Sequence, residues 1–126
     1  MNLAICAFAV ASGGALGALA RYALASRLDG KFGFFPLGTF CANMLSSFAL
    51  GIFMGLSNAG ESSPLFDFFA QTGFCATLST FSALAFQIAA MLEKRRLAEA
   101  FAYALATFLS GVLLFAAAAN IFSFRA

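Results

Sequence analysis

The chain has 126 residues, of which 63% are hydrophobic and 10% are charged, with 7 Lys and Arg against 5 Asp and Glu. Soluble domains carry roughly a quarter charged residues, so this composition excludes a soluble catalytic domain, a nucleic-acid-binding protein and a large receptor head. The uncharged stretches at residues 1–20, 32–60, 68–92 and 100–124 each reach the ~20 residues that a helix needs to cross a bilayer. The sequence therefore predicts an all-α membrane protein, one domain with four transmembrane helices.

Short connections with turn-forming or charged residues separate the expected helices. The four spans are expected at about residues 3–24, 37–56, 65–92 and 98–122. The first connection is expected to contain Arg27, Asp29 and Lys31 together with glycines that break a helix. The second connection is a cluster of Ser, Asn, Gly and Pro, and the third is a charged segment at residues 93–96. Connections this short make neighbouring helices antiparallel.

Basic residues are distributed unequally between the two sides that these antiparallel helices define. The side of the first and third connections holds Arg21, Arg27, Lys31, Lys94, Arg95 and Arg96. The other side holds Arg125 alone. The bias is still five to one when Arg21 is discounted as part of a helix. The positive-inside rule then predicts that both termini lie outside the cytoplasm.

Small and polar residues recur every four positions in three of the expected helices. The stripes are Gly13, Gly17 and Arg21 in the first helix, Thr39, Asn43, Ser47, Gly51 and Gly55 in the second, and Tyr103, Thr107 and Gly111 in the fourth. Residues four apart share one face of a helix. Such a face is typical of close helix packing. The amide and phenol need partners in hydrocarbon, and they either bond across helices or line a polar path.

The expected third helix contains four hydroxyl side chains within six residues. Thr77, Ser79, Thr80 and Ser82 lie near the middle of an uncharged stretch, and so near the middle of the bilayer. Crowded hydroxyl and β-branched residues weaken a helix because their side chains compete for backbone hydrogen bonds. This pattern indicates either a break near the middle of the helix that binds an ion, or an intact helix whose hydroxyls bond back onto it.

Arg21 has two interpretations. Near the membrane surface its side chain extends to water, whereas facing a cavity it supplies positive potential and favours an anion. No acidic residue is expected within a span, which weighs against a proton-coupled pump and against a small multidrug-type exporter. The three cysteines lie singly in apolar stretches and histidine is absent, so buried thiols are expected rather than a zinc site.

At these residues the chain resembles the fluoride channel family, Fluc/CrcB. The matching segments are Gly13-Gly-Ala-Leu-Gly-Ala-Leu-Ala-Arg21-Tyr22, Gly38-Thr39-Phe-Cys-Ala-Asn43, and Gly73-Phe-Cys with Ser79-Thr80-Phe81-Ser82. The length, the four spans and the order of the motifs agree with the family. The resemblance implies a passive fluoride channel, not an enzyme, that exports fluoride across the inner (plasma) membrane as a multi-pass antiparallel dimer.

The resemblance also implies roles for individual residues. A structural sodium ion at the dimer axis would be held by backbone carbonyls at positions matching Ala76 and Ser79. The fluoride pathway would contain Asn43, Phe81, Ser82, Leu84, Tyr103 and Thr107, with Arg21 at its vestibule. Ring edges carry positive partial charge, and amide and hydroxyl donors replace the water around fluoride.

The chain departs from the family pattern in and after the expected break. Ala76 and Thr77 replace two glycines, Leu84 replaces the second ring, Gln87 replaces a usual acid, and Gly111 replaces a hydroxyl residue. An antiparallel homodimer in lipid is the favoured expectation. The alternative is a dimer of unlike subunits in which this chain is a non-conducting or half-conducting partner, and the unequal distribution of basic residues fits that alternative.

Overall fold

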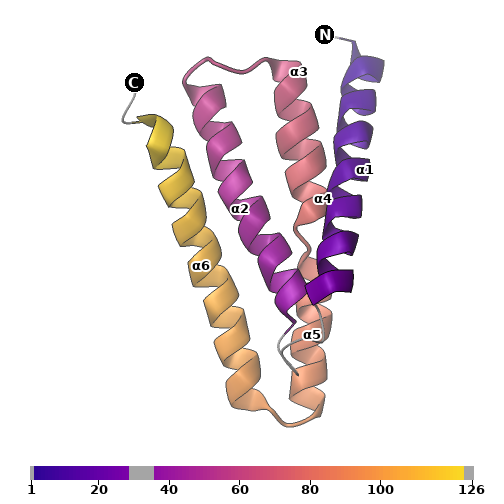
Figure 1. Ribbon diagram of the computed structural model, residues 1–126, viewed down its shortest axis with the longest axis vertical. Helices are drawn as coiled ribbons and strands as arrows, with labels where there is room; N and C mark the ends of the chain where they lie inside the picture. The colour runs from indigo at the N-terminus through magenta and orange to yellow at the C-terminus, as the bar shows by residue number, and fades with distance from the viewer. Residues whose placement is uncertain (1, 29–35, 124–126) are drawn as a thin grey trace.

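The computed structural model describes residues 2–28 and 36–123 (Figure 1). The elements in chain order are α1 (Leu3–Leu28), α2 (Leu37–Asn58), α3 (Pro64–Asp67), the π-helix η1 (Phe68–Cys75), α4 (Ala76–Leu78), α5 (Phe81–Glu93) and α6 (Leu97–Ser123). Four helical segments are long and apolar enough to cross a membrane, and the third of them, Pro64–Glu93, combines α3, η1, α4 and α5. The expected all-α architecture with four spans is therefore confirmed.

The helix ends differ in detail from the expected ones. α1 continues to Leu28, so Arg27 lies in its last turn and not in the connection as expected. No proline interrupts this segment, and its alanines and leucines favour continued helix. The other residues of the expected first connection, Asp29 and Lys31, lie outside the described residues, as does Arg125.

Local sequence explains where the third span begins and why α2 stops. The side-chain oxygen of Ser63 accepts a hydrogen bond from the Phe66 N–H, and Pro64 takes a first-turn position where no N–H is needed. The turn after α2 contains Gly60 at a φ of 76°. Glycine adopts this left-handed conformation without steric cost, which allows the chain to reverse direction there.

Glycines bring the helices close together. α2 packs mainly against α6, and α1 packs mainly against η1. A Cβ atom added at Gly13 would collide with the Phe69 carbonyl, and one added at Gly17 would collide with the Phe74 carbonyl. Gly51 lies equally close to the backbone of α6. Close helix packing therefore explains Gly13, Gly17 and Gly51 of the sequence stripes.

Thr77 links the third span to α1. Its Oγ1 atom lies 2.9 Å from the Gly14 carbonyl oxygen on α1 and 2.9 Å from the Gly73 carbonyl oxygen in its own span. A hydroxyl in hydrocarbon needs an acceptor, and this one has acceptors on both sides of the helix contact. One member of the hydroxyl cluster is thus used to join two helices.

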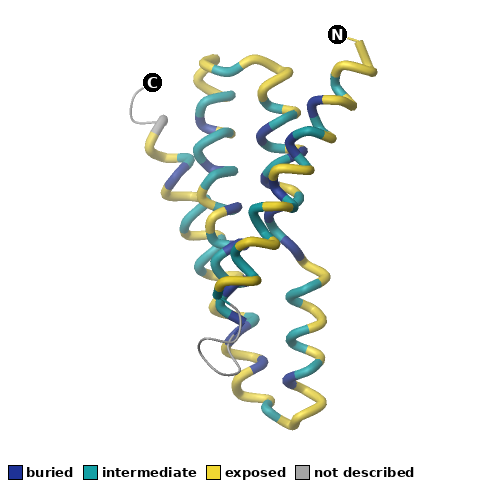
Figure 2. Tube along the Cα trace, turned by 45° about the vertical axis from the view of Figure 1, so that its right-hand side comes forward, coloured by how far each residue is buried: buried dark blue, intermediate teal, exposed yellow. Residues whose placement is uncertain are grey.

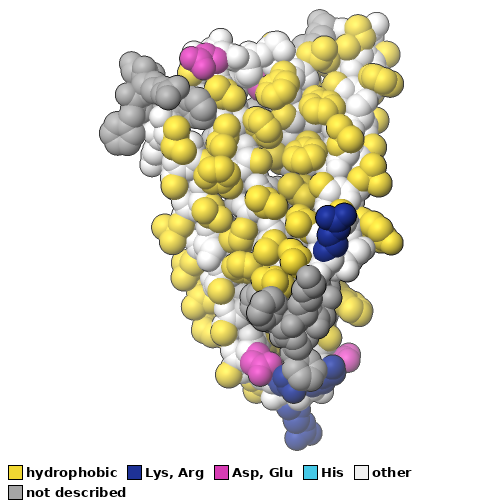
Figure 3. Space-filling model, viewed as in Figure 1, with side chains coloured by type: hydrophobic (Ala, Val, Ile, Leu, Met, Phe, Trp, Pro, Cys, Tyr) yellow, Lys and Arg dark blue, Asp and Glu magenta, His cyan; other side chains and the backbone are white. Residues whose placement is uncertain are grey.

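Most apolar surface of the single chain faces outward. Between 17% and 28% of the residues in the most apolar window of each span are buried, and Figure 2 shows buried residues at intervals between exposed ones along the helices. Hydrophobic side chains cover most of the face in Figure 3, whereas Lys and Arg side chains gather toward the lower end. α1 begins and α6 ends at the opposite, upper end (Figure 1).

Three acidic residues, Asp67, Glu93 and Glu99, lie within the spans near their ends, so the expectation that the spans contain none is wrong there. Asp67 lies in the first turn of the third span, where its carboxylate accepts hydrogen bonds of 2.8 Å from each of the Ser57 and Ser62 hydroxyls. Glu99 lies in the first turn of α6 and pairs with Arg96 at 3.2 Å. Local donors bind the carboxylates of Asp67 and Glu99, and Glu93 is the last residue of the third span.

Candidate ion pathway

The third span is interrupted for two residues between α4 and α5. Ser79 (φ −75°, ψ 155°) and Thr80 (φ −149°, ψ 116°) have extended backbone, and helix resumes at Phe81. Asn43 Oδ1 on α2 accepts a buried hydrogen bond of 2.8 Å from the Thr80 N–H. Thr80 in turn caps α5, because its Oγ1 accepts a hydrogen bond of 3.2 Å from the Ala83 N–H.

These two hydrogen bonds release two carbonyl groups from the helix. In a continuous helix the Thr80 N–H would bond to the Ala76 carbonyl, and the Ala83 N–H would bond to the Ser79 carbonyl. Both N–H groups are instead bound by side-chain oxygens. In the described part of the chain, the Ala76 carbonyl oxygen accepts only a long hydrogen bond of 3.4 Å, which the Ser79 hydroxyl donates. The interruption therefore leaves the Ala76 and Ser79 carbonyl oxygens without their helical hydrogen bonds.

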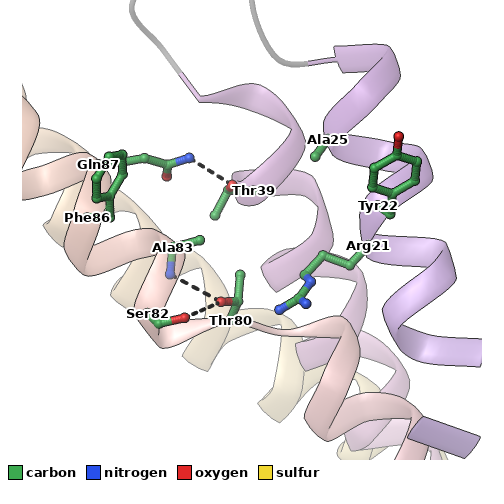
Figure 4. Close-up of a pocket in the computed structure, with 9 residues that line it drawn as sticks. All are labelled: Arg21, Tyr22, Ala25, Thr39, Thr80, Ser82, Ala83, Phe86 and Gln87. Atoms are coloured by element: carbon green, nitrogen blue, oxygen red, sulfur yellow. Dashed lines mark hydrogen bonds between the residues drawn. The ribbon is translucent and has the colours of Figure 1, made fainter. Parts of the chain in front are cut away.

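A polar pocket of about 520 Å³ lies between α1, α2 and the first turns of α5 (Figure 4). It is lined by Arg21, Tyr22, Ala25, Thr39, Thr80, Ser82, Ala83, Phe86 and Gln87. The Arg21 side chain extends across it toward Thr80. The N-terminus of α5, which carries positive partial charge, also borders this space. The pocket therefore combines a guanidinium, hydroxyls and a helix N-terminus, and none of its lining residues is acidic.

A hydrogen-bonded chain of three side chains runs from this pocket into the helix interface. Gln87 Nε2 donates to Thr39 Oγ1 at 2.9 Å, and the Tyr103 hydroxyl donates to Gln87 Oε1 at 3.0 Å. Thr39 and Tyr103 are both buried. Gln87 therefore holds two hydroxyl side chains, from α2 and α6, in fixed orientations.

Thr107 lies one helical turn after Tyr103 on α6 and differs from the other buried polar residues. Its side chain is 8% exposed, and its Oγ1 is the one buried side-chain oxygen or nitrogen without a hydrogen-bond partner in the described part of the chain. An unpaired buried hydroxyl costs free energy, so each such group in a native structure needs an explanation. The described residues provide no partner for this hydroxyl.

The structure brings part of the predicted pathway together. Arg21 and Ser82 line the pocket, and Asn43 lies at its inner end through its bond to Thr80. Tyr103 does not line the pocket, but its hydroxyl donates a hydrogen bond to Gln87, which does.

Two predicted pathway residues lie elsewhere. Phe81 is 82% exposed on the outer surface of the chain. Leu84 packs against a cluster of Met91, Ala100 and Tyr103 inside the α5–α6 contact. Neither side chain lines the pocket of the single chain.

Sequence reasoning did not assign Thr39, Thr80 and Gln87 to the pathway, although all three line the pocket. Each carried a signal. Thr39 lies four residues before Asn43 on the same helix face, and Gln87 follows Thr80 by seven residues, which is two helical turns. A polar residue at such spacing in an apolar helix indicates the side of the helix that faces other polar groups.

The arrangement is suited to a small anion. A guanidinium and several N–H and O–H donors surround a partly enclosed space, and such donors can replace water around an anion that leaves solvent. The hydrogen bond between Asn43 and Thr80 lies where the pocket meets the interrupted backbone.

Comparison with known proteins identifies relatives of this chain. The profile of the family described as "CrcB-like protein, Camphor Resistance (CrcB)" matches residues 8–119. A relative from Chromobacterium violaceum named "Fluoride-specific ion channel FluC" is 38% identical over 107 residues, covering 84% of each chain. The protein of that name from Pyrococcus horikoshii is 41% identical over 103 residues, covering 81% of this chain and 82% of the relative. A third, from Paraburkholderia xenovorans, is 40% identical over 90 residues and 71% of each chain.

Proposed function

The chain belongs to the CrcB-like family, and we propose that it is a subunit of a passive, fluoride-selective ion channel. The observation that carries this proposal is the pocket in which Arg21 and hydroxyl side chains surround a space without acidic lining, next to the buried Asn43–Thr80 bond. Positive potential attracts an anion, and closely placed donors compensate a small anion for the water it loses.

The proposed pathway begins at Arg21 in the vestibule and continues along donors of three helices. Asn43 and Ser82 lie at the interrupted segment, and Tyr103 and Thr107 continue along α6. The unpaired Thr107 hydroxyl supports this route, because a passing anion is a partner for its O–H group. Phe81 contributes to the pathway at a subunit contact, since its ring is exposed on a single chain.

A structural sodium ion fits the released carbonyls of Ala76 and Ser79. Carbonyl oxygens are suitable sodium ligands, and here their helical hydrogen bonds are lost to Asn43 Oδ1 and Thr80 Oγ1. Two carbonyls do not complete the coordination of a cation in hydrocarbon. A second copy of the chain in antiparallel orientation would contribute the same pair across a two-fold axis, which supports the proposed dimer.

The direction of net transport follows from the chemistry of fluoride. Neutral HF enters a cell across the membrane and dissociates in the more alkaline cytoplasm, where fluoride ions accumulate. A passive channel in the inner (plasma) membrane therefore exports fluoride without an energy source. No step in this proposal requires a covalent reaction, so the protein acts as a channel and not as an enzyme.

The packing of Leu84 favours a second candidate function, that of a partner subunit in a dimer of unlike chains. Leu84 occupies the position of the second ring, and it packs against Tyr103 inside the chain instead of facing the pocket. A pathway that needs a ring from this subunit at that position would be impaired, whereas the pathway built on the partner's rings would conduct.

Fluoride efflux from liposomes that contain this protein alone tests the proposal. A fluoride electrode should record efflux well above that of protein-free liposomes, with chloride efflux unchanged. Efflux that appears only after a second, unlike subunit is added would support the partner function instead. Absence of efflux in both preparations would contradict both candidates.

A further inference from the structure

The chain contains two helix-ending turns with the same backbone design at opposite ends of the molecule. After α2, the Glu61 N–H bonds to the Leu56 carbonyl at 2.9 Å and the Gly60 N–H to the Ser57 carbonyl at 3.1 Å. After α5, the Arg96 N–H bonds to the Met91 carbonyl at 2.9 Å and the Arg95 N–H to the Leu92 carbonyl at 3.0 Å. Both are Schellman turns, in which the residue after the cap adopts a left-handed conformation.

The residue in the left-handed position differs between the two turns. Gly60 has a φ of 76°, which is the usual solution, whereas Arg95 has a φ of 59°. Arg95 is the one non-glycine residue with positive φ in the described part of the chain. A side chain in this conformation is strained, and such strain is a reason to look for a function of that side chain.

Arg95 lies in the turn between the third and fourth spans, among other charged residues. It lies between the spans Pro64–Glu93 and Leu97–Ile121, which places it near a membrane surface. The turn between α5 and α6 is at the lower end of Figure 1, and Lys and Arg side chains gather at that end in Figure 3. Its side chain is exposed. The neighbouring Arg96 is half-buried and pairs with Glu99, and Glu93 is exposed on the last turn of α5. Arg95 is thus an exposed positive charge between the ends of two candidate membrane spans.

An exposed apolar stripe continues from this turn along α6 into the membrane. Leu97 is 64% exposed and Phe101, one turn later on the same face, is 70% exposed. Leu105 and Phe108 extend the exposed stripe. A positive charge above an apolar stripe matches a molecule with an anionic head and a hydrocarbon tail.

We propose that Arg95 binds the phosphate group of an anionic lipid head group while the acyl chain of that lipid lies along Leu97 and Phe101. The Schellman turn fixes the backbone of Arg95 through two hydrogen bonds, so the guanidinium is held at head-group depth. The guanidinium fork binds phosphate by paired hydrogen bonds. This site is separate from the polar pocket, which is lined by α1, α2 and the first turns of α5.

Thermal unfolding of the purified full chain in a neutral detergent tests the site. Phosphatidylglycerol should raise the wild-type unfolding temperature, whereas phosphatidylcholine and soluble glycerol phosphate should not. Arg95→Gly removes both the charge and the strain, so it should unfold at a higher temperature than wild type without lipid and lose most of the phosphatidylglycerol shift. Arg95→Lys should keep much of the shift.

A second variant and two further outcomes make the test decisive. Arg95→Asn tolerates the left-handed conformation without the charge, so it should also lose most of the shift. A full phosphatidylglycerol shift in both Arg95→Gly and Arg95→Asn would overturn the proposal. A wild-type shift with glycerol phosphate alone would overturn the assignment to a lipid, and an equal shift with phosphatidylcholine would overturn the requirement for an anionic head group.

Discussion

Asn43 Oδ1 on α2 and the Thr80 backbone N–H in the third span are joined by a buried hydrogen bond of 2.8 Å. The bond connects a side chain to backbone 37 positions away, in the segment where helix gives way to two extended residues. It removes the N–H group that would otherwise close the helix onto Ala76. One amide therefore stabilises the interrupted backbone and also stands beside the polar pocket.

Replacing Asn43 with leucine should abolish fluoride flux and leave assembly of the channel intact. The Thr80 N–H would lose its acceptor in a buried position, which costs about 1–3 kcal/mol of folding free energy. Fluoride efflux from liposomes and size-exclusion chromatography measure the two effects. Flux near that of wild type would contradict the role of this amide in the pathway.

Asn43→Asp separates the two roles of this side chain. Aspartate keeps an oxygen acceptor for the Thr80 N–H, so the stability of the chain should change less than in the leucine variant. Its negative charge in the pathway should repel fluoride and still suppress flux. Flux that returns to the wild-type rate in Asn43→Asp would show that the amide acts only on the backbone.

Gln87→Glu should make fluoride flux depend on pH. The described pocket contains no Asp, Glu or His, so wild-type flux should stay constant from about pH 6 to pH 8. An ionised glutamate would accept hydrogen bonds from both Thr39 and Tyr103 and place a negative charge beside the pathway. Flux of the variant should therefore fall relative to wild type as pH rises.

The measurement is the initial rate of efflux at each pH, corrected with protein-free liposomes. Gln87→Met is the matched control, because it removes both hydrogen bonds without adding a titrating group. Its flux should be lower than that of wild type and independent of pH. A constant ratio of Gln87→Glu to wild-type flux across the range would contradict the prediction.

Thr107→Val should reduce flux without reducing stability. The Thr107 hydroxyl is buried and unpaired, so an isosteric methyl group removes a polar atom that has no partner and raises or preserves the unfolding temperature. Flux should fall because the pathway loses a donor. Thr107→Ser keeps the hydroxyl and should keep most of the flux. Strong destabilisation of Thr107→Val would indicate that the hydroxyl has a structural partner.

Gly17→Ala should destabilise the protein while Gly14→Ala should not. A Cβ atom at position 17 would collide with Thr77 Oγ1 and the Phe74 carbonyl, whereas one at position 14 would meet its nearest atom, on Thr77, at 3.4 Å. Forcing α1 away from η1 should cost about 1–3 kcal/mol. Unfolding temperatures in detergent measure both variants, and equal temperatures would exclude close packing at Gly17 as the reason for its glycine.

The distribution of basic residues predicts one orientation with both termini outside the cytoplasm. α1 begins and α6 ends at the same end of the molecule, opposite the turn that carries Lys94, Arg95 and Arg96 (Figure 1). Basic residues near a span resist transfer across the membrane. Reporter fusions at the C-terminus should give a signal from outside only. Signals from both sides would support an antiparallel homodimer, and a single orientation would require an unlike partner.

Composition and periodicity by themselves determined the membrane architecture. The positions of the four spans follow from uncharged stretches, because transfer of a segment into hydrocarbon depends mainly on the residues it contains. The same reasoning identified Asn43 and Tyr103 as polar residues that need partners, and both are buried. The cluster of hydroxyls directed attention to the third span, in which Ser79 and Thr80 have extended backbone.

Only the tertiary structure decided which partner each polar group has. The pairing of Asn43 with Thr80, and of Gln87 with Thr39 and Tyr103, depends on the register and rotation of helices that are far apart in sequence. A repeat of four residues specifies a face of one helix but not the atom that lies opposite on the next helix. That the Thr107 hydroxyl is unpaired could likewise not be predicted from the sequence, because a missing partner can be recognised only after every neighbour has been placed.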